Sequence, residues 1–221
     1  MNLLQQTIKD ALAQQIRAEI IRGHLPPGKR LRLRDLAAQY KISTMPVREA
    51  LRDLEAEGLV TGEPRKGCAV TKLSADELQD IYEVRAQLES MAARLAVPKL
   101  SRAGIEVMSE LVAQMDRSIG DVVQLVDLNF RFHLALYAAS ERRHLCGLIT
   151  ILRHRTEHYL HAYMIQQKGM PLAQDEHRAI IRACKQQDVA RVEKLMHRHV
   201  LEAGQGVIKH VRRQESKTMN F

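Results

Sequence analysis

The sequence STMPVREALRDLEAEG, residues 43–58, contains the signals that begin and end one short helix. Ser43 or Thr44 can cap its N-terminus, Pro46 suits the first turn, and Gly58 ends it. Apolar side chains at helical spacing predict its buried face: Val47, Ala50, Leu51 and Leu54. The opposite face carries polar and basic groups: Thr44, Met45, Arg48 and Arg52. We therefore expect a helix that is packed on one side and free to meet a partner on the other.

Two further helices are predicted before this segment. Apolar side chains recur every four positions over residues 4–22: Leu4, Ile8, Leu12, Ile16 and Ile20. Gly23 ends this helix, and the two prolines of the next five residues prevent its continuation. A second, shorter helix is expected over residues 34–40, and a tight connection at residues 41–44 joins it to the third.

A β-hairpin with a basic tip is predicted after the third helix. The β-prone runs 59–61 and 69–71 are separated by a turn that contains two glycines and a proline. Arg65 and Lys66 lie at its tip beside Gly67. Three helices followed by a basic hairpin is the order of a winged helix-turn-helix, which we predict for residues 1–73. A protein-interaction domain built from the same elements is the alternative.

The distribution of charge favours a nucleic-acid partner for this domain. The net charge is +8, and residues 1–73 hold 13 Lys and Arg against 8 Asp and Glu, whereas the longer remainder holds 21 against 18. A helix fits the major groove of B-DNA with its N-terminal residues near the base edges. Arg48 is placed to reach a guanine edge or a phosphate, and the hairpin tip can approach an adjacent groove or the backbone.

The second domain, residues 74–213, is predicted to be an all-α antiparallel bundle. Its first helix begins with the capping box Ser74–Glu77 and ends near Pro98. Five more helices follow, at about residues 101–119, 122–139, 141–165, 172–186 and 188–213. Residues 214–221 are polar and are expected to be frayed. The fold class is therefore mainly α, with a small hairpin in the N-terminal domain.

Composition favours a cytoplasmic protein without a membrane partner. No apolar run approaches the roughly 20 residues that cross a bilayer. The three cysteines, Cys68, Cys146 and Cys184, stand far apart and form no CxxC pair. We expect reduced thiols with structural roles rather than a disulfide framework.

Three histidines on three predicted helices share the apolar, inward stripe of their helix. They are His133, His177 and His199. Neutral imidazoles that converge in this way suit a transition metal, and the amide of Asn129, four residues before His133, can add an oxygen ligand. The alternative is that each is a core histidine satisfied by a hydrogen bond. A second line, His154, His158 and His161, follows one face of its helix, as a polar face or a further chelating pair.

The N-terminal domain resembles the GntR family of bacterial transcription regulators. The resemblance rests on four blocks in this order: residues 25–28, 33–37, 46–51 and 54–60. It implies that Arg34, Arg48, Lys66 and Gly67 contact operator DNA. Together with the exposed side of the third helix and the hairpin tip, the predicted DNA-binding residues are Arg34, Ser43, Thr44, Met45, Arg48, Arg65, Lys66 and Gly67. Relatives usually carry Arg-Thr where this chain has Thr44-Met45, so one expected base or phosphate contact is lost here.

The C-terminal domain resembles the FCD effector domain of the FadR-type branch of that family. Three blocks match: residues 129–133, 176–180 and 196–200. The resemblance implies a divalent metal, zinc or nickel by preference, held by Asn129, His133, His177 and His199, with a small carboxylate effector in the same cavity. The family more often has Asp where this chain has Asn129. It also implies that Arg85 faces the pocket, where its guanidinium can hold a carboxylate; a surface or intersubunit ion pair with Glu89 is the alternative.

These features together predict a homodimeric, DNA-binding transcription regulator, most simply a repressor, and not an enzyme. Two winged domains would contact the half-sites of a pseudo-palindromic operator in double-stranded DNA. The effector would then change operator affinity by favouring one placement of the DNA-binding domains. Two alternatives are a regulator for which the ion itself is the signal, and a metallohydrolase with three histidine ligands.

Overall fold

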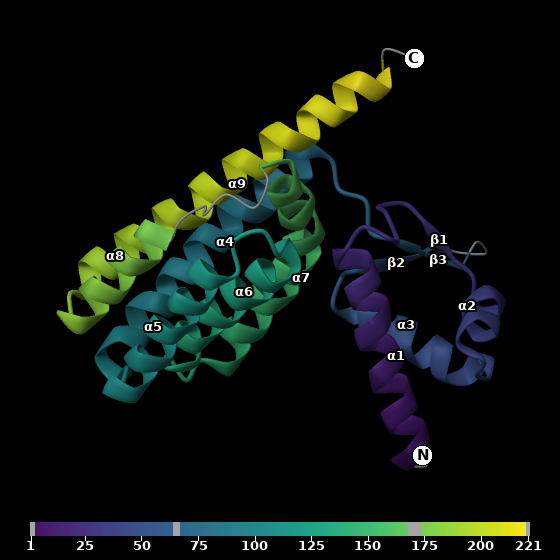
Figure 1. Cartoon of the computed structure of the whole chain (residues 1–221), viewed down its shortest axis with the longest axis horizontal. Coiled ribbons are helices and arrows are strands. Elements are labelled where there is room, and N and C mark those ends of the chain that lie inside the picture. The colour runs from purple at the N-terminus through teal and green to yellow at the C-terminus, as the bar shows by residue number, and fades with distance from the viewer. Residues whose placement is uncertain (1–2, 64–66, 168–173, 220–221) are drawn as a thin grey trace. The chain divides into compact units, whose positions relative to one another are not determined.

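The computed structural model describes residues 3–63, 67–167 and 174–219, which form two compact units (Figure 1). The first comprises Met1–Leu73 with His154–His158, and the second comprises Ser74–Arg153 with Tyr159–Phe221. No helix within the described ranges is both long enough and apolar enough to cross a membrane.

The N-terminal unit has the winged helix-turn-helix fold that the sequence predicts. Its elements are α1 (Leu3–Ile21), β1 (Arg30–Leu31), α2 (Leu33–Tyr40), α3 (Thr44–Ala56), β2 (Val60–Glu63) and β3 (Gly67–Val70). The antiparallel strands are ordered β1-β3-β2, with Val60 opposite Val70 and Arg30 opposite Ala69. The sequence predicts the β2–β3 hairpin but not the two-residue strand β1, which completes the sheet.

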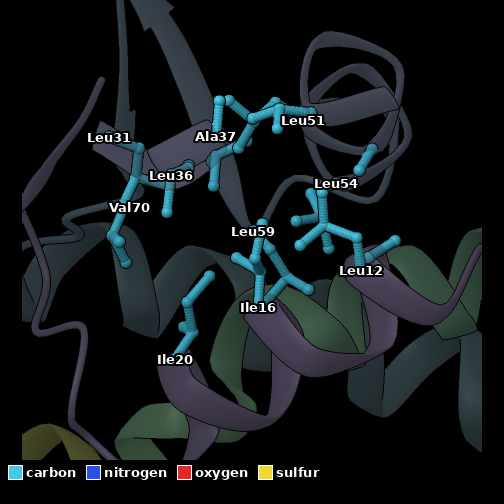
Figure 2. Close-up of a cluster of buried hydrophobic side chains, with 14 residues drawn as sticks. Leu12, Ile16, Ile20, Leu31, Leu36, Ala37, Leu51, Leu54, Leu59 and Val70 are labelled. Atoms are coloured by element: carbon cyan, nitrogen blue, oxygen red, sulfur yellow. The ribbon is translucent and has the colours of Figure 1, made fainter. Parts of the chain in front are cut away.

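The core of this unit fixes the orientation of α3. Apolar side chains of α1, α3 and the sheet meet in one cluster, drawn in Figure 2, in which Ile16, Leu54 and Leu59 are fully buried. Because the stripe of α3 that contains Leu54 faces this cluster, the opposite stripe is left to solvent. The packing thus confirms the two faces that the sequence predicts for this helix.

The turn between α2 and α3 depends on one left-handed residue. Lys41 has φ 53° and ψ 43°, and the Ile42 amide donates to the Ala37 carbonyl at 3.1 Å. This closes α2 in the manner of a helix C-cap. Ser43 then occupies the N-cap position of α3 with extended backbone, although its hydroxyl makes no capping hydrogen bond. At the other end, Gly58 with φ 76° ends α3 as predicted.

The second unit is a helical bundle. Its elements are α4 (Ala75–Ala96), the 3₁₀ turn η1 (Val97–Lys99), α5 (Arg102–Arg117), α6 (Val122–Ala138), α7 (Arg143–Gln166), α8 (Gln174–Lys185) and α9 (Val189–Met219). The capping box at the start of α4 forms as predicted, with the Ser74 hydroxyl accepting from the Glu77 amide at 3.2 Å. Helix α4 packs along α9, and α8 packs against both α5 and α9.

The last helix is longer than the sequence predicts. It continues through Met219, whereas residues 214–221 were expected to be frayed. Side chains on its final turns have partners on α4: the Arg212 guanidinium donates to Asp76 at 2.9 Å, and Glu215 accepts from the Ala75 amide at 3.3 Å. These contacts with the start of α4 extend the helix beyond the last apolar residue of its stripe.

Candidate functional site

The exposed face of α3 carries the predicted DNA-contacting side chains. Ser43, Thr44, Met45 and Arg48 are all exposed, and 58% of Met45 is accessible to solvent. They lie in the first turns of α3, the part of a recognition helix that meets base edges. An exposed methionine beside an arginine offers both an apolar surface, as a thymine methyl requires, and a hydrogen-bond donor.

A groove of about 550 Å³ joins this face to the sheet and is lined by four guanidinium groups, together with Asp35 and Glu55. The arginines come from α3, α2 and the residue before α2: Arg48, Arg52, Arg34 and Arg32. Glu55 already accepts the Gly62 amide at 2.9 Å. Gly67 also lines the groove, so the structure brings Arg34, Arg48 and Gly67 together as predicted, whereas Arg65 and Lys66 lie outside the described residues.

The second candidate site is a cluster of three buried histidines in the helical bundle. His133 comes from α6, His177 from α8 and His199 from α9, and one ring nitrogen of each lies within 4.8 Å of the others. The Nε2 atoms of His133 and His199 are 3.2 Å apart. The convergence predicted from the inward stripes is therefore present, and nitrogen donors at this spacing suit a transition-metal ion.

His133 and His199 each have a hydrogen-bond partner at Nδ1. A ring proton on Nδ1 leaves the Nε2 lone pair of that histidine available as a ligand. The Tyr137 hydroxyl donates to the Glu89 carboxylate at 2.6 Å, so at 3.1 Å it accepts from Nδ1–H of His133. Nδ1–H of His199 donates to the carboxylate of Glu176 at 2.6 Å. A hydrogen bond from the distal ring nitrogen to an oxygen is the usual support of a metal-binding imidazole.

The surroundings of His177 indicate whether the three imidazoles suit a metal ion. It is 1% exposed, and neither of its ring nitrogens has a hydrogen-bond partner within the part of the chain that the structure describes. Burial lowers the pKa of His177 well below its ordinary value, so the ring is neutral. A buried, neutral nitrogen that lacks a partner is costly unless a ligand completes it. The residues present thus fit a divalent ion.

A buried ion-pair network lies behind His133. Burial alone would raise the pKa of Glu89, but Arg85 and Arg153 outweigh it and lower the pKa to about 2. Arg85 Nε donates to Glu89 at 2.8 Å, and Arg153 Nη1 donates to it at 2.8 Å. Arg85 therefore pairs with Glu89, the partner of the alternative interpretation, but the pair is buried within the protein rather than at its surface.

A cavity of about 240 Å³ adjoins the cluster. His177 and His199 line it, as does Asn129, one turn before His133 on α6. Asn129 is thus near the imidazoles as predicted. Two glutamates also line the cavity and were not predicted: Glu176 on α8 and Glu202 on α9. Their positions next to His177 and one helical turn after His199 are the signal that could have indicated them.

The other candidate residues do not join this cluster. Among the described residues, the group of histidines, cysteines and acids close enough to hold an ion consists of the three buried imidazoles, without His154, His158 or His161. Burial raises the pKa of Cys68 and of Cys184 to about 11. Both are free thiols that stay protonated at neutral pH, as expected of structural cysteines.

Comparison with family models matches both halves of the chain. Residues 8–70 match the bacterial regulatory proteins of the gntR family, and residues 80–202 match the FCD domain. The two matches cover the recognition helix α3 and all four predicted metal ligands.

Individual relatives agree with these matches. The Nta operon transcriptional regulator of Aminobacter aminovorans is 33% identical over 70% of this chain and 72% of its own length. The transcriptional repressor GlaR of Escherichia coli is 29% identical over 84% of this chain and 89% of its own. The solved structure of E. coli McbR/YncC has a TM-score of 0.78 and 27% identity, and the match covers 97% of this chain and 100% of that one.

Proposed function

The chain belongs to the gntR family of bacterial regulatory proteins and carries an FCD domain, and from this premise we propose that a small carboxylate, bound on a metal ion held by His133, His177 and His199, controls its affinity for operator DNA. That the protein is a transcriptional regulator follows from the family, and repressors are among its relatives. These relatives are regulators and not enzymes, so the metallohydrolase alternative is set aside. We also propose that the protein acts as a repressor and that it does so in the cytoplasm.

The observation that carries the proposal is the unsatisfied state of His177. Its two ring nitrogens are buried and have no partner among the described residues, while Nε2 of His133 and of His199 lie within reach. A divalent ion completes all three, with the amide of Asn129 as a fourth ligand from the wall of the cavity. The ion supplies a positive charge on which an anionic ligand can bind.

The ligand changes DNA binding only if it favours one state of the regulator over another. We further propose a homodimer, because two identical winged domains match the half-sites of a pseudo-palindromic operator. Light scattering of the protein with and without an operator duplex tests this part. A single chain per duplex at saturation would contradict it.

Metal analysis tests the core of the proposal. Untagged protein purified without chelator is expected to contain about one zinc or nickel ion per chain, and His199→Ala is expected to lose it. The matched control is His197→Ala on the same helix, since His197 contacts Gln87 instead of the cluster. Absence of metal from the wild type after addition of zinc and nickel would overturn the proposal.

A second measurement separates the two kinds of signal. Operator affinity is measured on metal-free and zinc-loaded protein, and then on zinc-loaded protein with small carboxylates. A change on adding the carboxylate at constant zinc supports the metabolite as the signal. A change on adding zinc alone, with no response to any carboxylate, would identify the ion as the signal instead.

A further inference from the structure

The walls of the cavity beside the histidine cluster carry negative charge. Glu176 and Glu202 line it, and no lysine or arginine does among the lining residues in the described ranges. The nearest guanidinium to Glu202 in this part of the chain is that of Arg198, at 3.9 Å, and more than half of that side chain is exposed. A ligand that carries only a carboxylate would therefore meet repulsion wherever it extends away from the ion.

The two glutamates act as a pair. Both carboxyl groups line the same cavity, and Glu176 Oε2 lies 2.6 Å from Nδ1 of His199. The pair places two acidic side chains on one wall beside the imidazoles. It lies where α8 and α9 face each other, directly beside the nitrogen donors.

The remaining lining is mostly apolar and limits the size of the ligand. Five aliphatic or thioether side chains contribute: Met115, Leu125, Leu160, Met164 and Ala203. At about 240 Å³ the cavity is smaller than the roughly 300–1,000 Å³ typical of sites for drug-sized ligands. It suits a compact molecule with a short hydrocarbon part.

The charges are divided between the proposed ion and the wall. Three imidazoles and the Asn129 amide are all neutral ligands, so a divalent ion held by them keeps its full charge toward a carboxylate. The compensating negative charge is placed on Glu176 and Glu202 instead. One end of the site therefore attracts an anion and the adjoining wall attracts a cation.

We propose that the ligand of this cavity is a small zwitterion, an aliphatic amino acid or close analogue, whose carboxylate binds the ion and whose ammonium group binds Glu176 and Glu202. This proposal rests on the proposed function, because it needs the metal site. It narrows the ligand from carboxylates in general to carboxylates with an ammonium group.

Matched ligands test the assignment. Zinc-loaded protein is titrated calorimetrically with α-amino acids that have aliphatic side chains of one to four carbons. Each is paired with its 2-hydroxy acid and with the unsubstituted acid. At least one amino acid is expected to bind about tenfold or more tightly than both counterparts, because only it makes charged hydrogen bonds to the glutamates. Equal or tighter binding of the counterparts, or no binding of any amino acid, would overturn the proposal.

A variant separates this preference from simple chelation of the metal. Glu202→Gln removes a wall charge without touching a histidine, and it is expected to reduce the tenfold preference to about twofold. Glu106→Gln, an equally charge-reducing change at an exposed position of α5, is the control and should leave the preference unchanged. A preference that persists in Glu202→Gln would mean that the amine binds the ion rather than the wall, which contradicts the assignment.

The metal content of each sample distinguishes failure of the proposed function from failure of the ligand assignment. If the wild type holds no ion, the proposed function itself fails. If the ion is present and the amine preference is missing, only the ligand class is wrong.

Discussion

Nε2 of His133 and Nε2 of His199 lie 3.2 Å apart, although 66 residues separate them in the chain. The other ring nitrogen of each is already a donor, to the hydroxyl of Tyr137 and to the carboxylate of Glu176. An imidazole that donates through Nδ1 in this way can present the lone pair of Nε2 to a ligand. If these atoms hold the proposed ion, the residues behind the imidazoles would determine how tightly it is held.

Tyr137→Phe tests this support of His133. The change keeps the ring and removes the acceptor for Nδ1–H, and we expect zinc affinity to fall about 10- to 100-fold, as for other losses of a ligand's hydrogen-bond partner. Competition with a chromophoric chelator measures it. Tyr82→Phe on α4 is the control, because the Tyr82 ring packs against the Arg85 guanidinium and Gly204 instead of supporting a cluster imidazole. Unchanged affinity in Tyr137→Phe would show that the hydroxyl does not orient the imidazole.

Arg48→Ala tests the recognition helix. On an operator selected by the wild type from random duplexes, we expect a loss of about 1–3 kcal/mol in binding free energy if Arg48 contacts a base. If it contacts a phosphate, the slope of log affinity against log salt should fall by about one. Fluorescence anisotropy at several salt concentrations distinguishes these cases. Arg102→Ala, an exposed arginine of α5, should behave as the wild type. An Arg48→Ala protein with wild-type affinity and salt slope would remove α3 from the interface.

Glu89→Gln tests the buried ion-pair network. The variant leaves Arg85 and Arg153 without their shared carboxylate, and we expect the free energy of unfolding to fall by about 3–5 kcal/mol at pH 7. Urea denaturation measures it, and Glu83→Gln, at an exposed position of α4, should stay within about 0.5 kcal/mol of the wild type.

The pH dependence of that difference has a definite sign. The pKa of Glu89 is about 2 in the folded protein and 4.5 ordinarily. A lowered carboxyl pKa contributes stability above pH 4.5 that disappears as the pH falls toward 2. The gap between wild type and Glu89→Gln should therefore be constant from pH 7 to 5 and narrow below about 4.5. A gap that widens in acid would contradict the assignment of the charge to Glu89.

Two glycines in helices should respond to alanine in opposite directions. A Cβ at Gly204 of α9 would lie 2.6 Å from Cγ of Tyr82, close to the backbone of α4. Overpacking of about 1–3 kcal/mol should exceed the gain in helix propensity and lower the stability. Gly147 of α7 has no atom within 4 Å of that position, so Gly147→Ala should raise the stability by about 0.5–1 kcal/mol. Thermal unfolding measures the stability of both variants. A shift of the unfolding midpoint in the same direction for both would refute the packing argument.

Local signals predicted the elements whose stability is local. The capping box at Ser74 and the glycine stop at Gly58 depend on neighbouring residues, and both form as expected. Strand β1 was missed because its two residues become a strand only by pairing with Cys68 and Ala69. Its formation depends on the folded hairpin rather than on the local sequence.

The candidate site likewise contains residues that the sequence predicts and residues that it does not. Helical periodicity places His133, His177 and His199 inward, so their convergence could be predicted. The partners of these histidines could not, because the register between two helices is set by packing across the bundle. Tyr137 meets Glu89 across 48 residues, and Glu176 meets His199 across 23. A usable signal for Glu89 was its place on the buried stripe of α4 that contains Tyr82 and Arg85.

The order of the three histidines along the chain would govern when the proposed ion could bind. A ribosome makes α6 before α8 and α8 before α9, and domains assemble in that direction during synthesis. A nascent chain that ends before His199 holds only two imidazoles on helices that are not yet packed, which is too few ligands for a structural ion. If the proposed site holds an ion, a copy that ends before α9 would lack the third imidazole and could not hold it. The last of the described helices would therefore complete the proposed site.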